Sequence, residues 1–354
     1  MAPEPDRDSL GPRVRAPVRV VVLGMPCAFT RAALAAFLDA LLATQNDTAG
    51  LDLAAIVLAV PGAQPRSDLG RPAGFAMVPD DTPIWHLGAR AILADRAWLV
   101  RLDALAPDAI VSACFPWRIP QAVLGIPRRG GFNIHPSLLP AGRGPEPVFW
   151  AFRWGLRETG VTVHRMERGL DTGPILAQET VPIGDDATIP SLEAELASRG
   201  GALARRVIAD LRRGAARSAS QSSSVTPWAR IPGPDDLAVT TAWAAVDAAR
   251  FIRAVSPVHG RIGCVVIDTG RGIPPGFHAR DIVEVREDDE EGAEPVSREG
   301  DTMRVRFTPG TIRFRIVPDA APLILHSRTA VGGGVSAPCT PGKRSNALPG
   351  ALPG

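Results

Sequence analysis

The chain has 354 residues, of which 45% are hydrophobic and 21% are charged, and its formal net charge is +2. This length suffices for one large domain and a smaller second one. The nearly balanced charge excludes a protein that attracts nucleic acid or membrane through a strong overall field. The four cysteines form no Cys-x-x-Cys motif and show no metal-ligand spacing, which indicates a reduced, cytoplasmic protein without a metal. Residues 1–17 contain no apolar stretch, so we expect a flexible N-terminus and no membrane partner.

Apolar runs in the first part of the chain predict four buried strands separated by helices. The leucines from Leu34 to Leu42 recur at helical spacing, and 89–105 also has a helical pattern, whereas 61–85 is irregular and rich in proline and glycine. Strands that alternate with helices are typical of a parallel, Rossmann-like α/β sheet, whose ligands bind beyond the carboxyl ends of the strands. The four runs are VRVVVLG (18–24), LDLAAIVLAV (51–60), DAIVSACF (108–115) and GGFNIH (130–135).

The remaining sequence predicts the end of this α/β domain, a linker and a small β-rich domain. Helical patterns cover 147–157 and 191–214, and 158–166 alternates like a strand. The serine-rich stretch 218–227 is typical of a linker, and a helix at 243–257 precedes several short strands. We predict an α/β domain at 18–215, a linker at 216–227, a β-rich domain at 228–326 and a disordered tail at 327–354.

Three side chains form the main candidate site. Asn133 and His135 stand two residues apart at the end of the fourth predicted strand, so both lie on one face. Asp171 lies in the glycine-flanked turn GLDTG. Acyl transfer to an amine requires three groups of this kind. An amide binds the oxyanion, an imidazole moves the proton, and a carboxylate orients the imidazole. A structural histidine and a simple turn would give the same pattern, so spacing alone leaves both interpretations open.

Two longer segments carry a resemblance to a known family. FNIHPSLLPAGRGPEP (132–147) and ETGVTVHRMERGLDTGPILAQE (158–179) resemble the signature of the formyltransferases that use 10-formyltetrahydrofolate. This family includes enzymes that act on methionyl-tRNA, on glycinamide ribonucleotide and on amino sugars. The resemblance implies that Asn133 polarises the formyl oxygen, that His135 is the acid and base, and that Asp171 raises the pKa of His135.

The resemblance also implies where 10-formyltetrahydrofolate binds. Arg143 and Gly144 follow the folate loop, so we expect them on the acceptor side, although Arg143 could equally be a surface arginine. Pro116 departs from the family pattern and removes one backbone N–H from the first folate segment. His164 could either face the site or pack within its strand. The residues implied for the folate are Phe115, Trp117, Arg118, Ile119, Ser137, Leu138, Leu139, Pro140, Glu167, Arg168, Gly169 and Leu170.

The acceptor amine is left open by the sequence. Residues 228–260 resemble the start of the C-terminal domain of methionyl-tRNA formyltransferase, which implies an OB-like fold and initiator methionyl-tRNA as partner. The stretch 43–52, where the tRNA enzyme carries a basic loop, has no Lys or Arg. A small amine, such as an amino sugar, an amino acid or a ribonucleotide amine, is therefore the alternative acceptor. A formyl-tetrahydrofolate hydrolase and a non-catalytic folate binder remain as further alternatives.

Overall fold

The computed structural model describes residues 16–43, 50–62, 72–222, 226–256, 267–268, 282–288 and 296–315. The predicted C-terminal tail and all but the last two residues of the predicted flexible N-terminus lie outside the described residues. The chain divides into two compact units. The first comprises 1–143, 160–181 and 194–227, and the second comprises 144–159, 182–193 and 228–354. No helix within the described ranges is long and apolar enough to cross a membrane.

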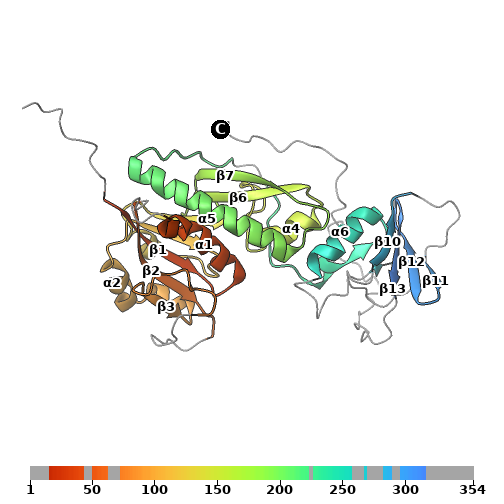
Figure 1. Ribbon diagram of the computed structural model, residues 1–354, viewed down its shortest axis with the longest axis horizontal. Helices are drawn as coiled ribbons and strands as arrows, with labels where there is room; N and C mark the ends of the chain where they lie inside the picture. The colour runs from red at the N-terminus through yellow and green to blue at the C-terminus, as the bar shows by residue number, and fades with distance from the viewer. Residues whose placement is uncertain are drawn as a thin grey trace, which may run out of the picture. The chain divides into compact units, whose positions relative to one another are not determined.

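Seven of the described strands form one mixed sheet in the order β3-β2-β1-β4-β5-β6-β7 (Figure 1). The pairs from β3 to β5 are parallel, and β6 pairs antiparallel with β5. The four predicted buried strands correspond to β1, β2, β4 and β5, so the predicted α/β sheet is confirmed. The strands are β1 (Val18–Gly24), β2 (Leu51–Ala59), β3 (Ile84–Leu87), β4 (Ala109–Ala113), β5 (Gly131–His135), β6 (Glu158–Arg165) and β7 (Ile175–Pro182).

The two edge strands were missed by the sequence patterns. The short strand β3 lies in the stretch expected to be irregular, and β7 follows the turn that contains Asp171. Only Ile175 and Val181 are buried in β7. An edge strand has a neighbouring strand on one side only, so more of its side chains stay exposed. Such strands lack the continuous apolar run that marks a strand buried on both faces.

The first predicted helix is α1 (Ala28–Ala43), and the helix predicted over 89–105 is divided in two. A 3-10 turn, η1 (Arg90–Ala94), precedes α2 (Arg96–Asp103). Asp95 between them is extended, and its carboxylate accepts a hydrogen bond from the backbone N–H of Trp98 at 3.1 Å. This N-cap fixes the start of α2. The short helix α3 (Gln121–Leu124) follows β4.

Two glycines allow the long helix α5 (Ile189–Arg213) to pack closely on α1 and β5 within the first unit. Figure 1 shows α1 and α5 side by side. A Cβ atom at Gly201 would collide with the carbonyl oxygen of Ala33 in α1, and one at Gly200 would collide with the side chain of Ile134 in β5. The glycine pair that weakens the helical propensity of this segment is therefore required by its packing.

The second unit contains α4 (Pro147–Arg153), α6 (Ala245–Val255) and short strands. The rings of Phe149 in α4 and Phe251 in α6 pack edge to face, with centroids 5.8 Å apart. Four of its described strands form an antiparallel sheet in the order β10-β13-β12-β11, while β8 pairs with β9. The bounds are η2 (Pro234–Leu237), β8 (Val239–Thr240), β9 (Ile267–Asp268), β10 (Ile282–Arg286), β11 (Val296–Glu299), β12 (Thr302–Arg306) and β13 (Thr311–Arg315).

Candidate active site

The end of β5 presents Asn133 and His135 to the neighbouring strand β6. In the antiparallel register Asn133 is opposite His164, and His135 is opposite Thr162. His135 and His164 are buried, with 4% and 2% of their surface exposed. The two imidazole rings lie edge to face at 6.3 Å between centroids. His164, whose orientation the sequence left open, therefore faces the site.

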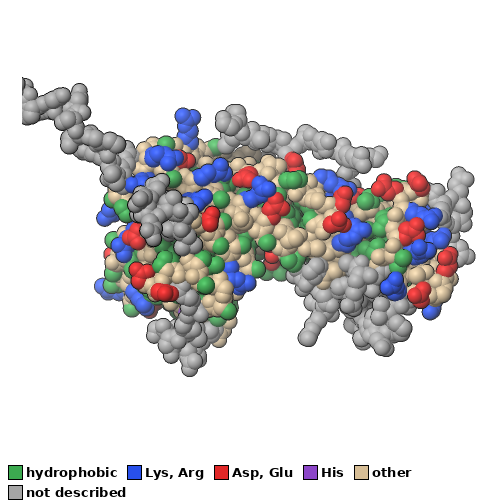
Figure 2. Space-filling view, viewed as in Figure 1, with side chains coloured by type: hydrophobic (Ala, Val, Ile, Leu, Met, Phe, Trp, Pro, Cys, Tyr) green, Lys and Arg blue, Asp and Glu red, His purple; other side chains and the backbone are tan. Residues whose placement is uncertain are grey.

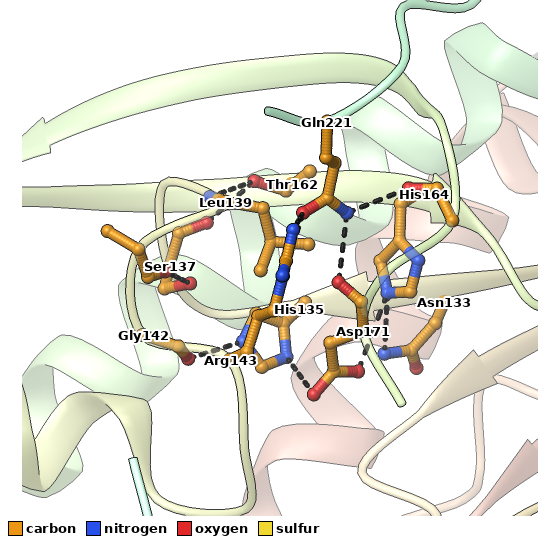
Figure 3. A network of polar contacts seen from close by, with 12 residues as sticks. Asn133, His135, Ser137, Leu139, Gly142, Arg143, Thr162, His164, Asp171 and Gln221 are labelled. Atoms are coloured by element: carbon orange, nitrogen blue, oxygen red, sulfur yellow. Dashed lines mark hydrogen bonds and ion pairs between the residues drawn. The ribbon is translucent and has the colours of Figure 1, made fainter. Parts of the chain in front are cut away.

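The carboxylate of Asp171 lies between the two imidazoles (Figure 3). Its Oδ2 atom is 3.8 Å from Nδ1 of His135, and its Oδ1 atom is 3.7 Å from Nε2 of His164. Both separations exceed a hydrogen bond, so the attraction is electrostatic and acts in a buried environment. Asp171 has a φ of 54°, in the left-handed region that aspartate tolerates better than most residues. The structure thus brings together the three side chains that the spacing pointed to.

Backbone carbonyls determine which ring nitrogens carry hydrogen. Nε2 of His135 donates to the carbonyl of Gly142 at 2.9 Å, because a carbonyl only accepts. Nδ1 of His164 donates to the carbonyl of Arg165 at 2.9 Å, which leaves its Nε2 as an acceptor. That acceptor lies 3.3 Å from Nδ2 of Asn133. The Asn133 amide therefore donates one N–H to His164 and keeps its second N–H for a ligand.

His164 is held in the neutral form. Burial, followed by the charge of His135, lowers the pKa of His164 from 6.5 to about 4, against the opposing effect of Asp171. At neutral pH this imidazole is uncharged, so its Nε2 can accept a hydrogen bond from the Asn133 amide. As a neutral group it also does not compete with His135 for the Asp171 carboxylate. His164 therefore orients the Asn133 amide.

Gln221 joins two parts of the site, and it was not predicted as a site residue because it lies in the serine-rich stretch. Its Oε1 accepts from Nε and Nη2 of Arg143 at 3.0 and 2.7 Å. Its Nε2 donates to the carbonyls of Asp171 and Gly173 at 2.9 and 2.7 Å (Figure 3). Gln221 thus fixes both the Arg143 guanidinium and the turn that carries the Asp171 carboxylate.

The loop after His135 is held by hydrogen bonds from β6 and β7. The hydroxyl of Thr162 donates to the carbonyl of Ser137 at 2.6 Å and accepts from the backbone N–H of Leu139 at 3.2 Å. The amide of Gln178 donates to the carbonyl of Leu139 at 3.0 Å and to the Thr162 hydroxyl at 2.8 Å. Leu139 is buried, whereas Leu138 and Pro140 are partly exposed. These bonds, together with the prolines, make the loop rigid.

The two other segments implied for folate binding meet each other. The guanidinium of Arg118 donates to the carbonyl of Arg168. Phe115 and Trp117 are partly buried and pack edge to face at 5.6 Å, while the turn from Glu167 to Leu170 is exposed. Gly144, which was expected on the acceptor side, lies in the second unit, and its φ of 124° and close approach to Ala229 account for the glycine.

Comparisons with known proteins decide the family. A formyl transferase family model matches residues 33–208. The methionyl-tRNA formyltransferase of Aromatoleum aromaticum is 34% identical over 255 residues, which cover 70% of this chain and 75% of the relative. That of Stutzerimonas stutzeri is 33% identical over 276 residues, which cover 73% and 82%. The chain belongs to the formyltransferase family. It is a formyl-transferring enzyme, and its formyl donor is a formyl-folate.

Two further comparisons of this formyltransferase differ in identity and in coverage. The methionyl-tRNA formyltransferase of Pseudomonas putida W619 is 41% identical over 156 residues, which cover 44% of this chain and 50% of the relative. The solved structure of WlaRD, a sugar 3N-formyl transferase, shares the fold with a TM-score of 0.55 at 16% identity, and the match covers 85% of this chain and 98% of WlaRD. Among the described residues, no group of three or more His, Cys, Asp and Glu side chains could hold a metal ion.

Proposed function

We propose that this formyltransferase transfers the formyl group of 10-formyltetrahydrofolate to the amine of initiator methionyl-tRNA, as in translation initiation. The observation that carries the chemistry is the Asp171 carboxylate between the imidazoles of His135 and His164, beside the Asn133 amide. The observation that favours the acceptor is the match to methionyl-tRNA formyltransferases over 70% of the chain. Such a role takes place in the cytoplasm, the compartment expected from the cysteine composition.

In the proposed mechanism each side chain has a separate task. The folate supplies the formyl group that the acceptor amine attacks. The free N–H of Asn133 stabilises the oxyanion that develops on the formyl oxygen, because a preorganised donor in a buried site is strongly stabilising. His135 takes the proton of the attacking amine and returns it to the leaving nitrogen. Asp171, whose Oδ2 lies 3.8 Å from Nδ1 of His135, assists this proton transfer by orienting the imidazole.

The folate is proposed to bind against three segments of the first unit. The rigid loop Ser137–Pro140 is adjacent to His135, and the Arg118–Arg168 contact joins the exit of β4 to the turn before Asp171. The exposed turn Glu167–Leu170 is the proposed contact of the pterin ring, and Phe115 and Trp117 offer apolar surface. Arg143 is proposed to lie on the acceptor side.

The second unit is the proposed tRNA-binding part. The antiparallel sheet fits an OB-like domain at 228–326, joined through a linker at 216–227. Basic and acidic side chains are interspersed on the face shown in Figure 2. Arg313 pairs with Glu284 at 3.0 Å and Arg304 with Glu299 at 3.3 Å, so part of the positive charge is neutralised. This pairing is the observation that favours the alternative, a small amine as acceptor.

The acceptor is tested by the release of tetrahydrofolate from 10-formyltetrahydrofolate. Parallel reactions contain initiator methionyl-tRNA, elongator methionyl-tRNA, amino sugars or amino acids. We expect turnover with the initiator tRNA alone, and an apparent affinity that falls with salt because phosphate contacts release counterions. Turnover with a small amine only would overturn the tRNA assignment, and release without any acceptor would indicate a hydrolase.

A further inference from the structure

Two cysteines that are far apart in the sequence meet at the carboxyl edge of the sheet. Cys27 follows β1 at the start of α1, and Cys114 follows β4 directly. The strands β1 and β4 are neighbours, with Gly24 opposite Ala113. A side-chain interaction with Cys114 is the largest influence on the pKa of Cys27, which places the two thiols close to each other. Cys114 is exposed and Cys27 is partly exposed, so small reagents can reach both sulfur atoms.

Thr30 contacts both Cys27 and the residue directly before Cys114. Its hydroxyl lies 3.4 Å from Sγ of Cys27 and donates to the carbonyl of Ala113 at 2.9 Å. Its backbone N–H donates to Sγ of Cys27 at 3.5 Å. Cys114 has a φ of 57°, in the left-handed region that a residue other than glycine rarely adopts. The backbone thus makes an unfavourable turn at the second cysteine of the pair.

The environment of Cys27 favours the thiolate. The hydrogen bond from Cys114 is the largest cause, and bonds from Thr30 and from the backbone of Phe29 add to it against the effect of burial. Together they lower the pKa of Cys27 from 9.0 to about 5. Thiolates at helix N-termini are the reactive form of cysteine in thiol–disulfide exchange.

We propose that Cys27 and Cys114 form a reversible intramolecular disulfide that regulates the neighbouring folate segment. The oxidant is a low-molecular-weight disulfide such as oxidised glutathione. The Cys27 thiolate attacks one of its sulfur atoms, forms a mixed disulfide and releases one thiolate. The Cys114 thiol then loses its proton and attacks Sγ of Cys27, which releases the second thiol. Two protein thiols and one small disulfide thus become one protein disulfide and two small thiols.

The regulatory part rests on the proposed function, because the disulfide acts on the loop that carries Phe115. Cys114 is the residue directly before Phe115, and Phe115 and Trp117 pack against the core of the sheet. Closing an S–S bond requires the two sulfur atoms to approach to about 2 Å, so the exit of β4 must shift toward α1. We therefore expect the oxidised form to bind the folate more weakly.

The linkage itself is tested without any assay of activity. A variant with Cys264→Ser and Cys339→Ser is equilibrated in glutathione buffers of graded redox ratio, alkylated, digested and analysed by mass spectrometry. We expect a peptide pair linked through Cys27 and Cys114 within one chain, which dithiothreitol separates. Adding Cys114→Ser should stop the reaction at a mixed disulfide on Cys27. Adding Cys27→Ser should abolish the linked pair and leave only a mixed disulfide on Cys114, formed at least ~10-fold more slowly than that on Cys27. Absence of the linked pair at every ratio, or linkage only between chains, would overturn the proposal.

The regulatory part is tested on the same samples by tetrahydrofolate release with initiator methionyl-tRNA. We expect the oxidised protein to lose at least ~5-fold in turnover and to regain it with dithiothreitol, on the scale of a positioning defect near a ligand. The Cys27→Ser/Cys114→Ser variant should not respond to oxidised glutathione. An unchanged turnover in the linked protein would overturn the regulation. Inactivity of the reduced protein would contradict the proposed function and leave the peptide result in place.

Discussion

His164 and Asn133 form a pair across β5 and β6 in which the imidazole Nε2 lies 3.3 Å from the amide Nδ2. Because His164 uses its other nitrogen to donate to a carbonyl, it accepts from Asn133 and so determines which way the amide faces. In the proposed mechanism Asn133 meets the formyl oxygen, and His164 is a positioning residue rather than a catalytic one.

The low pKa of His164 predicts how stability depends on pH. Burial lowers this pKa from 6.5 to about 4, so between these values the unfolded chain binds a proton that the folded protein does not. The free energy of unfolding should therefore fall as the pH drops from 6.5 toward 4, with a contribution of at most about 1.4 kcal/mol per pH unit. Urea unfolding of the wild type and of His164→Gln at several pH values measures this. Equal slopes for the two proteins would contradict the prediction.

Gln221 should matter for turnover although it lies outside the family signature. In Gln221→Ala the turn at Asp171 loses its amide donor, and we expect kcat to fall roughly 10-fold, as the loss of about one hydrogen bond's net free energy would give. Gln221→Glu keeps an acceptor for Arg143 but loses the donor, and should be as slow. The exposed residue Gln121 provides the control, Gln121→Ala, with unchanged turnover. Normal turnover in Gln221→Glu would assign the importance of Gln221 to Arg143 alone.

Gly173 is required by packing in the turn after Asp171. A Cβ atom there would collide with the carbonyl oxygen of Arg165, so Gly173→Ala should lower the free energy of unfolding by about 2 kcal/mol or more. At Gly184 a Cβ atom would meet no atom within 4 Å, and Gly184→Ala should change the stability by less than about 0.5 kcal/mol. Chemical denaturation of both variants checks the difference. Equal free energies of unfolding for the two variants would contradict this prediction and show that the turn around Gly173 can adjust to a Cβ atom.

The sequence predicted the centre of the fold better than its edges. Strands β1, β2, β4 and β5 are buried on both sides and carry continuous apolar runs, so their positions could be read directly. The edge strands β3 and β7 are short or mostly polar and gave no such signal. The OB-like closure of the second unit and the domain boundaries stay predictions.

The candidate site shows the same division between local and long-range information. Asn133 and His135 were found because their spacing and strand position are local features, and Asp171 was found because its glycine-flanked turn is local as well; the family resemblance implied their roles. Gln221 could not be found, since a glutamine among serines reaches Asp171 only through the tertiary fold. The pairing of Cys27 with Cys114 likewise depends on the neighbouring positions of β1 and β4 in the sheet.

The central claim is that His135 and Asp171 carry the chemistry of formyl transfer. The most direct measurement is the rate of tetrahydrofolate release from 10-formyltetrahydrofolate, with initiator methionyl-tRNA as acceptor. His135→Ala and Asp171→Ala are compared with the wild type and with His86→Ala, whose imidazole lies on the edge strand β3. We expect each site variant to lose at least ~100-fold in turnover while folding normally, and His86→Ala to remain active. Near-normal turnover in either site variant would contradict the account.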